Sequence, residues 1–350
     1  MTKTDISSFL PEGLASYLAD LSEKSGVKIE KFRAKQIFSW LTKGVETFDE
    51  MTNVSSAIRN VLNENAYIAL PRVHTKLVSK IDGTVKYLFE LYDGERVESV
   101  FMRYEHGNTL CISTQVGCRM GCSFCASTLG GLVRNLTPSE MLGQIIAAQK
   151  DTGERVSNIV MMGIGEPLDN YDNTLKFLKL VNHPDGLCIG HRHISLSTCG
   201  LCDKIRTLAD ENLQITLSVS LHAPDQETRK NLMPVARKFE IEELIQACKY
   251  YIEKTGRRIS FEYSMIHGEN DSPEHAKKLA KVLSGMLCHV NLIPLNSVKE
   301  RSYTKSSREA IEEFIKILEK FHITATVRRR LGSDINASCG QLRRGSEVND

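Results

Sequence analysis

The sequence predicts an α/β protein in which a mainly parallel sheet forms a partially closed barrel of about six βα units, preceded by a small helical domain and a strand-rich connector. Three observations predict this class. Residues 1–70 carry helical spacing of apolar side chains, residues 71–104 alternate as strands do, and residues 105–350 alternate apolar β-branched segments with amphipathic ones. Repeated βα units indicate a parallel sheet, and this number of units favours a barrel over a small doubly wound sheet.

Each element has its own local signal. In the first domain the expected helices are 11–25, 33–43 and 55–66, and the connector strands are VKYLFELYDG and RVESVFMRY. The barrel strands are expected near TLCIS, NIVMMG, HISLST, ITLSVSL, ISFEYSMI, HVNLIPL and TATV. Helices between them are expected at 137–150, 241–255, 272–285 and 307–320. The first of these begins T-P-S-E, a capping box from Thr137 to Glu140 with proline at its first position.

No apolar run approaches the roughly 18 residues that a membrane helix requires, and the N-terminus MTKTDISSFLPEG lacks the charged and apolar regions of a secretory signal. We therefore expect a cytoplasmic protein without a membrane-spanning segment. In that compartment the ten cysteines indicate reduced thiols, metal ligands or catalytic groups rather than a framework of structural disulfides.

The formal net charge of +2 neither requires nor excludes a nucleic-acid partner, so any basic surface must be local. One local cluster in the helical domain comprises Lys28, Lys31, Arg33 and Lys35. Such a cluster is commonly the solvated start of a helix, and contact with nucleic acid is the alternative.

Polar and reactive residues follow six of the seven expected barrel strands. Ligands of a parallel βα fold gather at the C-terminal edge of the strands, because the loops there vary over a rigid scaffold. The sequence therefore predicts that these residues converge on one rim: Cys118, Cys122 and Cys125 after the first strand, Glu166 after the second, Ser197 and Thr198 after the third, Ser220, Leu221 and His222 after the fourth, Asn296 after the sixth, and Cys339 beyond the last.

The stretch GCRMGCSFCASTLGG, which holds the first three cysteines, is the most specific of these features. Three thiolates suit a 4Fe–4S cluster that leaves one iron open to another ligand. Small neighbours such as Gly117 and Gly121 allow a short loop to wrap the cluster and to aim backbone N–H groups at its sulfurs. A zinc site is the alternative, and it requires a fourth ligand, for which the nearby pair is Cys199 and Cys202.

The pattern CxxxCxxC, with Phe124 before its last cysteine, resembles the hallmark of radical S-adenosylmethionine enzymes. The stretches CISTQVGCRMGCSFCASTLGG, MMGIGEPLDN, SLSTCG, SVSLHAP, NLIPLN and DINASCGQL together resemble the dual-specificity adenine C2 methyltransferases of 23S rRNA and tRNA. The likeness runs from Glu98 to Gln341 and implies a radical S-adenosylmethionine barrel with a helical, RNA-binding N-terminal domain. It departs from the family in MGIGEP, where Ile164 replaces the more common methionine.

The resemblance implies a set of cofactor ligands. The metal ligands would be Cys118, Cys122 and Cys125, which would hold the 4Fe–4S cluster. Gly165 and Glu166 would bind the amino end of S-adenosylmethionine beside it. The methionyl and ribose sites would be formed by Ser197, Ser220, Leu221, His222 and Asn296.

The resemblance also implies roles for two further cysteines. Carbon 2 of adenine is electron-poor, so an ordinary methyl donor finds no nucleophile there. In the family, one S-adenosylmethionine methylates a cysteine, here Cys339, and a second supplies the radical that converts this S-methyl group into a methylene radical, which adds to the base.

The resulting protein–RNA bond must then be broken. By the same resemblance, Glu98 would take the proton from carbon 2, and Cys111 would attack the Cys339 sulfur. The product would be a Cys111–Cys339 disulfide that cellular reductants reopen. A buried structural thiol is the alternative for Cys111, and a solvated carboxylate is the alternative for Glu98. In the small-residue stretch ASCGQL we expect the Cys339 thiol to be mobile and accessible.

The remaining cysteines have weaker signals. The CxxC of Cys199 and Cys202 is interpreted as packing within the cofactor-binding stretch. Cys188, Cys248 and Cys288 have no partners by spacing and are expected to be core or surface thiols.

RNA must reach this rim with the target adenine turned out of its stack. Candidate phosphate contacts are the N-terminal basic cluster and Arg328, Arg329, Arg330, Arg343 and Arg344, with solvated surface as the alternative for each run. Strand alternation allows Arg328 and Arg330 to share one side.

The resemblance implies as substrates the peptidyl-transferase region of 23S rRNA and the adenosine 3′ of the tRNA anticodon. It also implies an external, flavodoxin-like electron donor and a monomeric enzyme. Two alternatives remain at this point. One is a radical S-adenosylmethionine enzyme with another substrate, including the related carbon-8 methyltransferases, and the other is a non-catalytic iron–sulfur or zinc RNA-binding protein.

Overall fold

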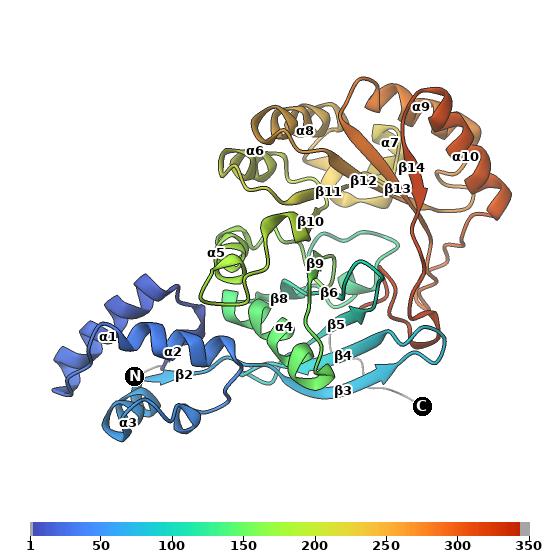
Figure 1. Ribbon diagram of the computed structural model, residues 1–350. Helices are drawn as coiled ribbons and strands as arrows, with labels where there is room; N and C mark the ends of the chain where they lie inside the picture. The colour runs from blue at the N-terminus through green and yellow to red at the C-terminus, as the bar shows by residue number, and fades with distance from the viewer. Residues whose placement is uncertain (1–2, 344–350) are drawn as a thin grey trace.

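The computed structural model describes residues 3–343 and contains one open sheet of ten strands (Figure 1). Seven strands run parallel: β6 (Thr109–Cys111), β9 (Asn158–Met161), β10 (Ile194–Thr198), β11 (Thr216–Ser220), β12 (Ile259–Met265), β13 (Cys288–Pro294) and β14 (Ala325–Val327). All seven expected barrel strands are therefore present. Because β14 is an edge of the sheet and pairs only with β13, the predicted partial closure of the barrel is confirmed.

The connector extends the same sheet. It consists of β3 (Arg72–Val78), β4 (Val85–Glu90) and β5 (Arg96–Met102), joined antiparallel to one another. β5 then pairs antiparallel with β6, the first barrel strand. The two expected connector strands are confirmed, and β3 is an additional edge strand.

Seven helices alternate with the parallel strands: α4 (Pro138–Thr152), α5 (Tyr171–Asn182), α6 (Cys202–Asp210), α7 (Gln226–Leu232), α8 (Ile241–Thr255), α9 (Pro273–Leu283) and α10 (Arg308–Lys320). α4 starts at the predicted capping box, in which Thr137 N–H donates to the Glu140 carboxylate at 2.9 Å. Within residues 3–343, no helix combines the length and apolar character needed to cross a bilayer.

The two faces of the parallel sheet differ in polarity. One face packs its apolar side chains, such as Leu196 and Val219, against these helices in the main hydrophobic core. The alternate residues point to the other face, where Ser195 Oγ and Ser218 Oγ lie 3.1 Å apart. The inner face is thus polar and is free to line a binding cavity.

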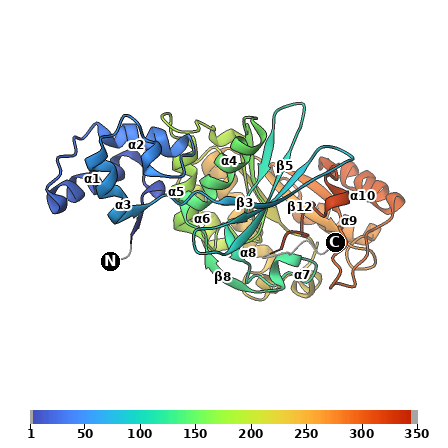
Figure 2. The ribbon, with the colours of Figure 1, turned by 90° about the horizontal axis from the view of Figure 1, so that it is seen from below.

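The N-terminal domain has a separate hydrophobic core. α1 (Pro11–Ser25), α2 (Arg33–Thr42) and α3 (Ser56–Asn65) agree with the expected helices, and the short strands β1 (Thr4–Asp5) and β2 (Ala66–Tyr67) pair across its two ends. Figures 1 and 2 place these helices at the opposite end of the molecule from α9 and α10. The domain is fixed to the barrel by hydrogen bonds such as Ser139 Oγ to the Asp5 carboxylate and by an ion pair of Lys150 with Glu46 at 3.0 Å.

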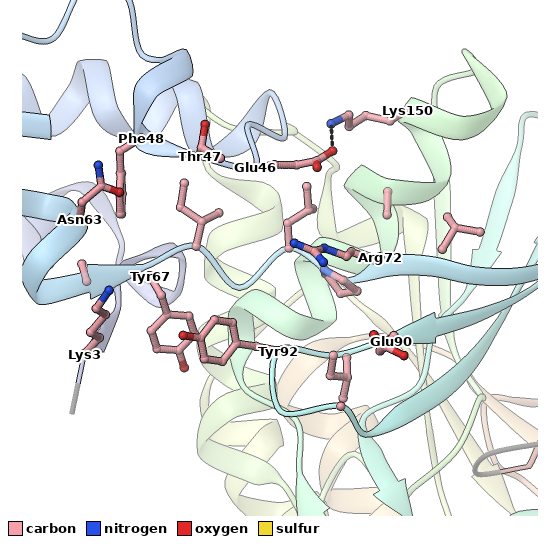
Figure 3. Close-up of a pocket in the computed structure, with 18 of the residues that line it drawn as sticks. Lys3, Glu46, Thr47, Phe48, Asn63, Tyr67, Arg72, Glu90, Tyr92 and Lys150 are labelled. Atoms are coloured by element: carbon pink, nitrogen blue, oxygen red, sulfur yellow. Dashed lines mark hydrogen bonds and ion pairs between the residues drawn. The ribbon is translucent and has the colours of Figure 1, made fainter. Parts of the chain in front are cut away.

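An open cleft lies where the segment after β2 crosses from the helical domain to the sheet (Figure 3). Tyr67 and Tyr92 stack in this cleft with ring centroids 4.2 Å apart, and the outer ring, Tyr92, is 65% exposed. Lys3 and Arg72 also line the cleft, and neither side chain has an ion-pair partner within residues 3–343.

Three of the four residues in the basic cluster of the helical domain have carboxylate partners. Lys28 and Arg33 lie 4.0 and 3.6 Å from the Glu30 carboxylate, and Lys35 lies 3.0 Å from Asp185. Arg33 is the first residue of α2, so the cluster fits the solvated start of a helix better than a nucleic-acid contact.

Candidate active site

One cavity opens at the C-terminal edge of the parallel strands and brings most of the expected site residues together. Its volume is about 150 Å³, and it is open to solvent. Its lining includes Cys118, Cys122, Cys125, Gly165, Glu166, Ser197, Ser220, His222, Asn296 and Cys339. The side chain of Leu221 does not line it and is buried in the main core. Cys111 and Glu98 lie outside this cavity. Cys111 lines a second cavity together with Cys339, and the Glu98 carboxylate accepts a hydrogen bond from Arg343 N–H.

A short hairpin, β7 (Gln115–Gly117) and β8 (Leu132–Asn135), holds the cysteine loop in place. Cys118 N–H donates to the Gly131 carbonyl at 2.9 Å, which ties the first cysteine to the base of the loop. Gly117 has a left-handed φ of 77°, and a Cβ placed on it would lie 1.9 Å from that same carbonyl oxygen. Glycine is therefore required where the chain enters the loop.

The three loop cysteines form a donor set that fits a cluster. Burial raises the pKa of Cys118 to about 12 and raises the pKa values of Cys122 and Cys125 as well, so a metal must displace their protons. Among residues 3–343 no three metal-ligating side chains converge on the position of a single ion. A 4Fe–4S cluster has no such requirement, because each thiolate binds a different iron.

The second CxxC does not add a ligand. Cys199 lines the cavity, but Cys202 is fully buried in the main core behind the sheet, and its Sγ lies 3.6 Å from the Gly200 carbonyl. The two thiols therefore face different environments, which agrees with packing roles. The lack of a single-ion position formed by three ligating side chains among residues 3–343 counts against the zinc alternative.

Glu166 and His222 are two buried titratable groups in the lining of the cavity. The Glu166 carboxylate accepts Cys199 N–H at 2.7 Å and Leu168 N–H at 3.0 Å, and burial raises its pKa. His222 Nδ1 accepts Ser264 N–H at 2.9 Å, and burial lowers the pKa of His222 to about 3. The imidazole is therefore neutral, and its proton is on Nε2. The ring packs edge-on against Phe124, with the two ring centroids 5.0 Å apart.

The fifth barrel strand contributes cavity residues that were not predicted from the sequence. Glu262 and Ser264 of β12 line the cavity beside His222. The signal was the alternation in ISFEYSM, where Glu262 falls on the inward-facing register of a strand whose other residues are apolar or small. An acidic residue in that register indicates a functional interior.

The segment that follows β14 fills the lateral gap between β14 and β5, and Figure 1 shows it descending alongside the connector strands. Its backbone is anchored at Cys339 and at the residue that follows it. Asn296 Nδ2 donates to the Cys339 carbonyl at 3.1 Å, and Ala126 N–H of the cysteine loop donates to the Gly340 carbonyl at 2.8 Å. The expected accessibility of the Cys339 thiol agrees with its half-buried side chain in the cavity lining, and its mobility stays a prediction.

Cys111 and Cys339 line a second, smaller cavity on the connector side of this segment. Cys111 is the last residue of β6 and packs with Val100, its cross-strand neighbour on β5. Burial, with the neighbouring Cys339 as the second cause, raises the pKa of Cys111 to about 12. All ten cysteines are free thiols in this structure.

Glu98 is buried rather than solvated, which corrects the alternative suggested by strand alternation. Its carboxylate lies 2.8 Å from Lys86 Nζ and accepts Arg343 N–H at 2.7 Å. On β5 it lies two residues from Val100 on the same face, and so it occupies the face that carries Cys111 on the next strand.

The arginines do not behave as one basic run. Arg328 is turned inward, with Nη1 at 3.2 Å from Met162 Sδ and 3.7 Å from the Glu262 carboxylate, whereas Arg329 and Arg330 are exposed. The Arg343 guanidinium forms an ion pair with Glu300. The regular strand ends at Val327, so strand alternation does not extend to Arg328 and Arg330, and both line the smaller cavity. Arg344 lies outside the described residues.

Two sequence profiles match the chain. Residues 112–280 match the radical SAM superfamily, and residues 4–68 match the ribosomal RNA large subunit methyltransferase N-terminal domain. A protein of Alkaliphilus oremlandii named "Probable dual-specificity RNA methyltransferase RlmN" is 57% identical over 98% of both chains. Its namesake in Clostridium tetani is 58% identical over 91% of both chains.

The structure is similar to a crystal structure of a radical SAM methyltransferase from Sphaerobacter thermophilus, with a TM-score of 0.91 and 41% identity over 97% of this chain and 99% of that one. The expected fold is confirmed, and so are the expected cofactors of the superfamily, a 4Fe–4S cluster and S-adenosylmethionine. The protein is therefore a radical SAM enzyme that acts on RNA. The chain belongs to the RlmN family of dual-specificity RNA methyltransferases.

Proposed function

We propose that this protein methylates carbon 2 of adenosine in 23S rRNA and in tRNA through an S-methylcysteine on Cys339. The observation that carries the proposal is the position of Cys339. It lines both the cavity of the cysteine loop and the smaller cavity of Cys111, and its neighbour Gly340 is hydrogen-bonded to the loop. A methyl carrier must meet a cofactor on one side and a second thiol on the other, and this position offers both.

For the cofactors we propose the ligands expected from the sequence. Cys118, Cys122 and Cys125 hold the cluster, which together with S-adenosylmethionine supplies the organic radical. Gly165, Glu166, Ser197, Ser220, His222 and Asn296 surround S-adenosylmethionine. The fully buried side chain of Leu221 leaves only its backbone available to a ligand.

The chain's own residues divide the remaining work. Cys339 carries the methyl group and becomes bonded to the base, and Glu98 takes the proton from carbon 2. Cys111 then releases the methylated RNA by attacking the Cys339 sulfur, which closes a transient disulfide. Support comes from the common face that Glu98 and Val100 share on β5, beside Cys111 on β6.

We propose as substrates the peptidyl-transferase region of 23S rRNA and the adenosine 3′ of the tRNA anticodon, and as electron donor a flavodoxin-like protein. The enzyme would act as a cytoplasmic monomer. We further propose that residues 1–70 form the accessory RNA-binding domain, residues 71–104 the connector and residues 105–350 the catalytic barrel. The separate core of the helical domain supports this division.

For RNA contact we favour the interdomain cleft over the basic cluster around Lys28. Tyr92 presents an exposed ring already stacked on Tyr67, and an unpaired base can stack on such a ring (Figure 3). Lys3 and Arg72 supply positive charge there without competing ion pairs within residues 3–343. Arg329 and Arg330, exposed beside the smaller cavity, would contact phosphates nearer the target base.

Two cysteine variants test the proposed chemistry. Incubated with S-adenosylmethionine, reductant and tRNA transcript, Cys111→Ala should accumulate a covalent protein–RNA species on a denaturing gel, because the carrier is intact and the resolving thiol is lost. Cys339→Ala should form none, because no carrier exists. Equal behaviour of the two variants would contradict the division of roles.

Mass spectrometry of nucleosides from RNA treated with the wild-type enzyme tests the position of methylation. We expect 2-methyladenosine, and the appearance of 8-methyladenosine in its place would contradict the proposal in favour of carbon-8 chemistry. RNA treated with Cys339→Ala serves as the control for background methylation.

A further inference from the structure

We propose that Arg328 is a positioning residue that holds the attacking thiolate of Cys111 next to Cys339, and that Glu262 fixes Arg328 in this place. The inference rests on the proposed function, because it concerns the step in which Cys111 releases the RNA. It assigns to Arg328 a role inside the site, where the sequence had suggested a phosphate contact.

The position of Arg328 is the first support. Arg328 lines the cofactor cavity and the smaller Cys111 cavity, and Cys339 is also common to both. Its side chain is about three-quarters buried, at 23% exposed. A cation placed where the two cavities meet faces both sulfurs involved in the release step.

The contacts of Arg328 fix its orientation. Nη1 lies 3.2 Å from Met162 Sδ and 3.7 Å from Glu262 Oε2. Glu262 is itself held, because Asn291 Nδ2 donates to its Oε2 at 2.7 Å and Ser260 Oγ donates to its Oε1 at 3.1 Å. The guanidinium is thus anchored from β12 and β13 while the two cysteines come from β6 and the segment after β14.

The charges around Cys111 make the effect of Arg328 specific. Cys339 on the adjacent segment and Tyr104 after β5 interact with it, and both become negative when they lose a proton. Glu98, on the same face of β5 as Val100, lies 2.8 Å from Lys86 Nζ. Arg328 is the cation that opposes Cys339 and Tyr104, with a smaller contribution from the Met162 backbone. Burial and Cys339 raise the pKa of Cys111, and Arg328 lowers it.

The release step shows why this matters. Cys111 loses its proton, and its sulfur forms a bond to the Cys339 sulfur. The bond between Cys339 Sγ and the bridging carbon breaks, and its electron pair stays with that carbon, which takes up a proton and becomes the methyl group. The two cysteines are oxidised by two electrons and the bridging carbon is reduced by two. Thiolate, not thiol, is the nucleophile, so the step depends on the charge next to Cys111.

The test measures the amount of the covalent protein–RNA species and its dependence on pH, which would not change if Arg328 only stabilised the fold. Arg328→Gln should accumulate this species at pH 7, as Cys111→Ala does, but should release the RNA as the pH is raised, since base can still ionise Cys111. The species formed by Cys111→Ala should persist at every pH. Arg308→Gln, which removes an exposed arginine of α10 that pairs with Glu312, should release RNA at pH 7 like the wild type.

A second measurement needs neither RNA nor S-adenosylmethionine. In a Cys339→Ala background, the rate of Cys111 alkylation by iodoacetamide is followed by peptide mass spectrometry from pH 6 to pH 10. Arg328→Gln should react at least about tenfold more slowly near neutral pH, with the profile displaced to higher pH, and Arg308→Gln should match the parent. Arg328→Lys keeps the charge, and its alkylation rate should lie between those of Arg328→Gln and the parent. This variant also controls for an effect of misfolding.

Unchanged alkylation in Arg328→Gln, or normal RNA release by this variant at pH 7, would overturn the inference. Failure of the proposed function would look different. In that case wild-type enzyme would make no 2-methyladenosine and Cys111→Ala would trap no RNA, while the alkylation profiles would still report on the contact between Arg328 and Cys111.

Discussion

The substitution Gly117→Ala offers a sharp test of how the cysteine loop is built. Gly117 has a φ of 77°, and its added Cβ would lie 1.9 Å from the Gly131 carbonyl oxygen. The left-handed conformation costs an alanine roughly 1–2 kcal/mol. To restore even a tight contact the carbonyl must retreat by about 1 Å, which breaks its 2.9 Å hydrogen bond with Cys118 N–H at a cost of about 1 kcal/mol.

The total of about 2–3 kcal/mol is modest for the whole protein, but the displacement is large for a metal site. Metal–ligand distances hold to within about 0.2 Å, and Cys118 follows the residue that must move. We therefore expect Gly117→Ala to remain folded and to lose most of its iron, from about four irons per chain to fewer than about one. Iron and sulfide per chain after anaerobic reconstitution are the measurements.

Gly130→Ala is the matched control. Gly130 lies in the same loop, but no atom lies within 4 Å of the position that an added Cβ would take, and its φ is not left-handed. It should retain full iron content. Full iron content in Gly117→Ala would refute the reasoning, because it would show that the loop accepts a side chain at its entrance without moving a ligand.

Three other predictions follow from the site and its surroundings. Replacing Cys118, Cys122 and Cys125 together by alanine should abolish iron binding, and unchanged iron content would remove the cluster assignment. Because burial lowers the pKa of His222 to about 3 from about 6.5 in the unfolded chain, the unfolded state takes up the proton first. The free energy of unfolding should therefore decrease through His222 as the pH falls from about 6.5 toward 3, by up to about 1.4 kcal/mol per pH unit. His222→Asn is a suitable variant because asparagine tolerates the left-handed φ of 54°. Urea unfolding at pH 7 and pH 5 should show a smaller loss of unfolding free energy in His222→Asn than in the wild type, and an equal loss in the two proteins would contradict the prediction. The affinity for RNA should fall as the salt concentration rises, and the slope of log affinity against log salt should correspond to only a few phosphate contacts. Binding that does not depend on salt would argue against the proposed RNA surface.

The helices were predictable because their signals are local. α1 begins at Pro11 and ends before Gly26 in the left-handed conformation, and α4 begins at its capping box. The barrel strands were predictable because one face is buried under helices, so their apolar alternation is strong.

Strand β3 was missed for the opposite reason. Most of RVHTKLV is exposed at the edge of the sheet, so burial imposes little apolar pattern on it. The hairpin strands β7 and β8 are three and four residues long, too short for a periodic signal.

The environments of Glu98 and Arg328 depend on partners that are distant in the chain. Local alternation cannot reveal that the Glu98 carboxylate accepts a hydrogen bond from Arg343 N–H, 245 residues later in the chain. Nor can it reveal that Arg328, just after β14, lies beside Glu262 of β12. Such long-range ion pairs are properties of the sheet order and of the segment after β14, neither of which a local pattern encodes.

The segment that closes the lateral gap has a consequence for the order in which the site can be assembled. Its contacts with the connector, such as Ser79 Oγ to Asp334 at 2.7 Å and Lys86 Nζ to the Asn336 carbonyl at 3.2 Å, span about 250 residues. Contacts that enclose so long a loop form after the local βα units. During synthesis from the N-terminus, the cysteine loop emerges some 200 residues before Cys339 does. The lateral side of the barrel therefore stays open while the cysteine loop is already present, and it closes only when the segment that carries Cys339 arrives.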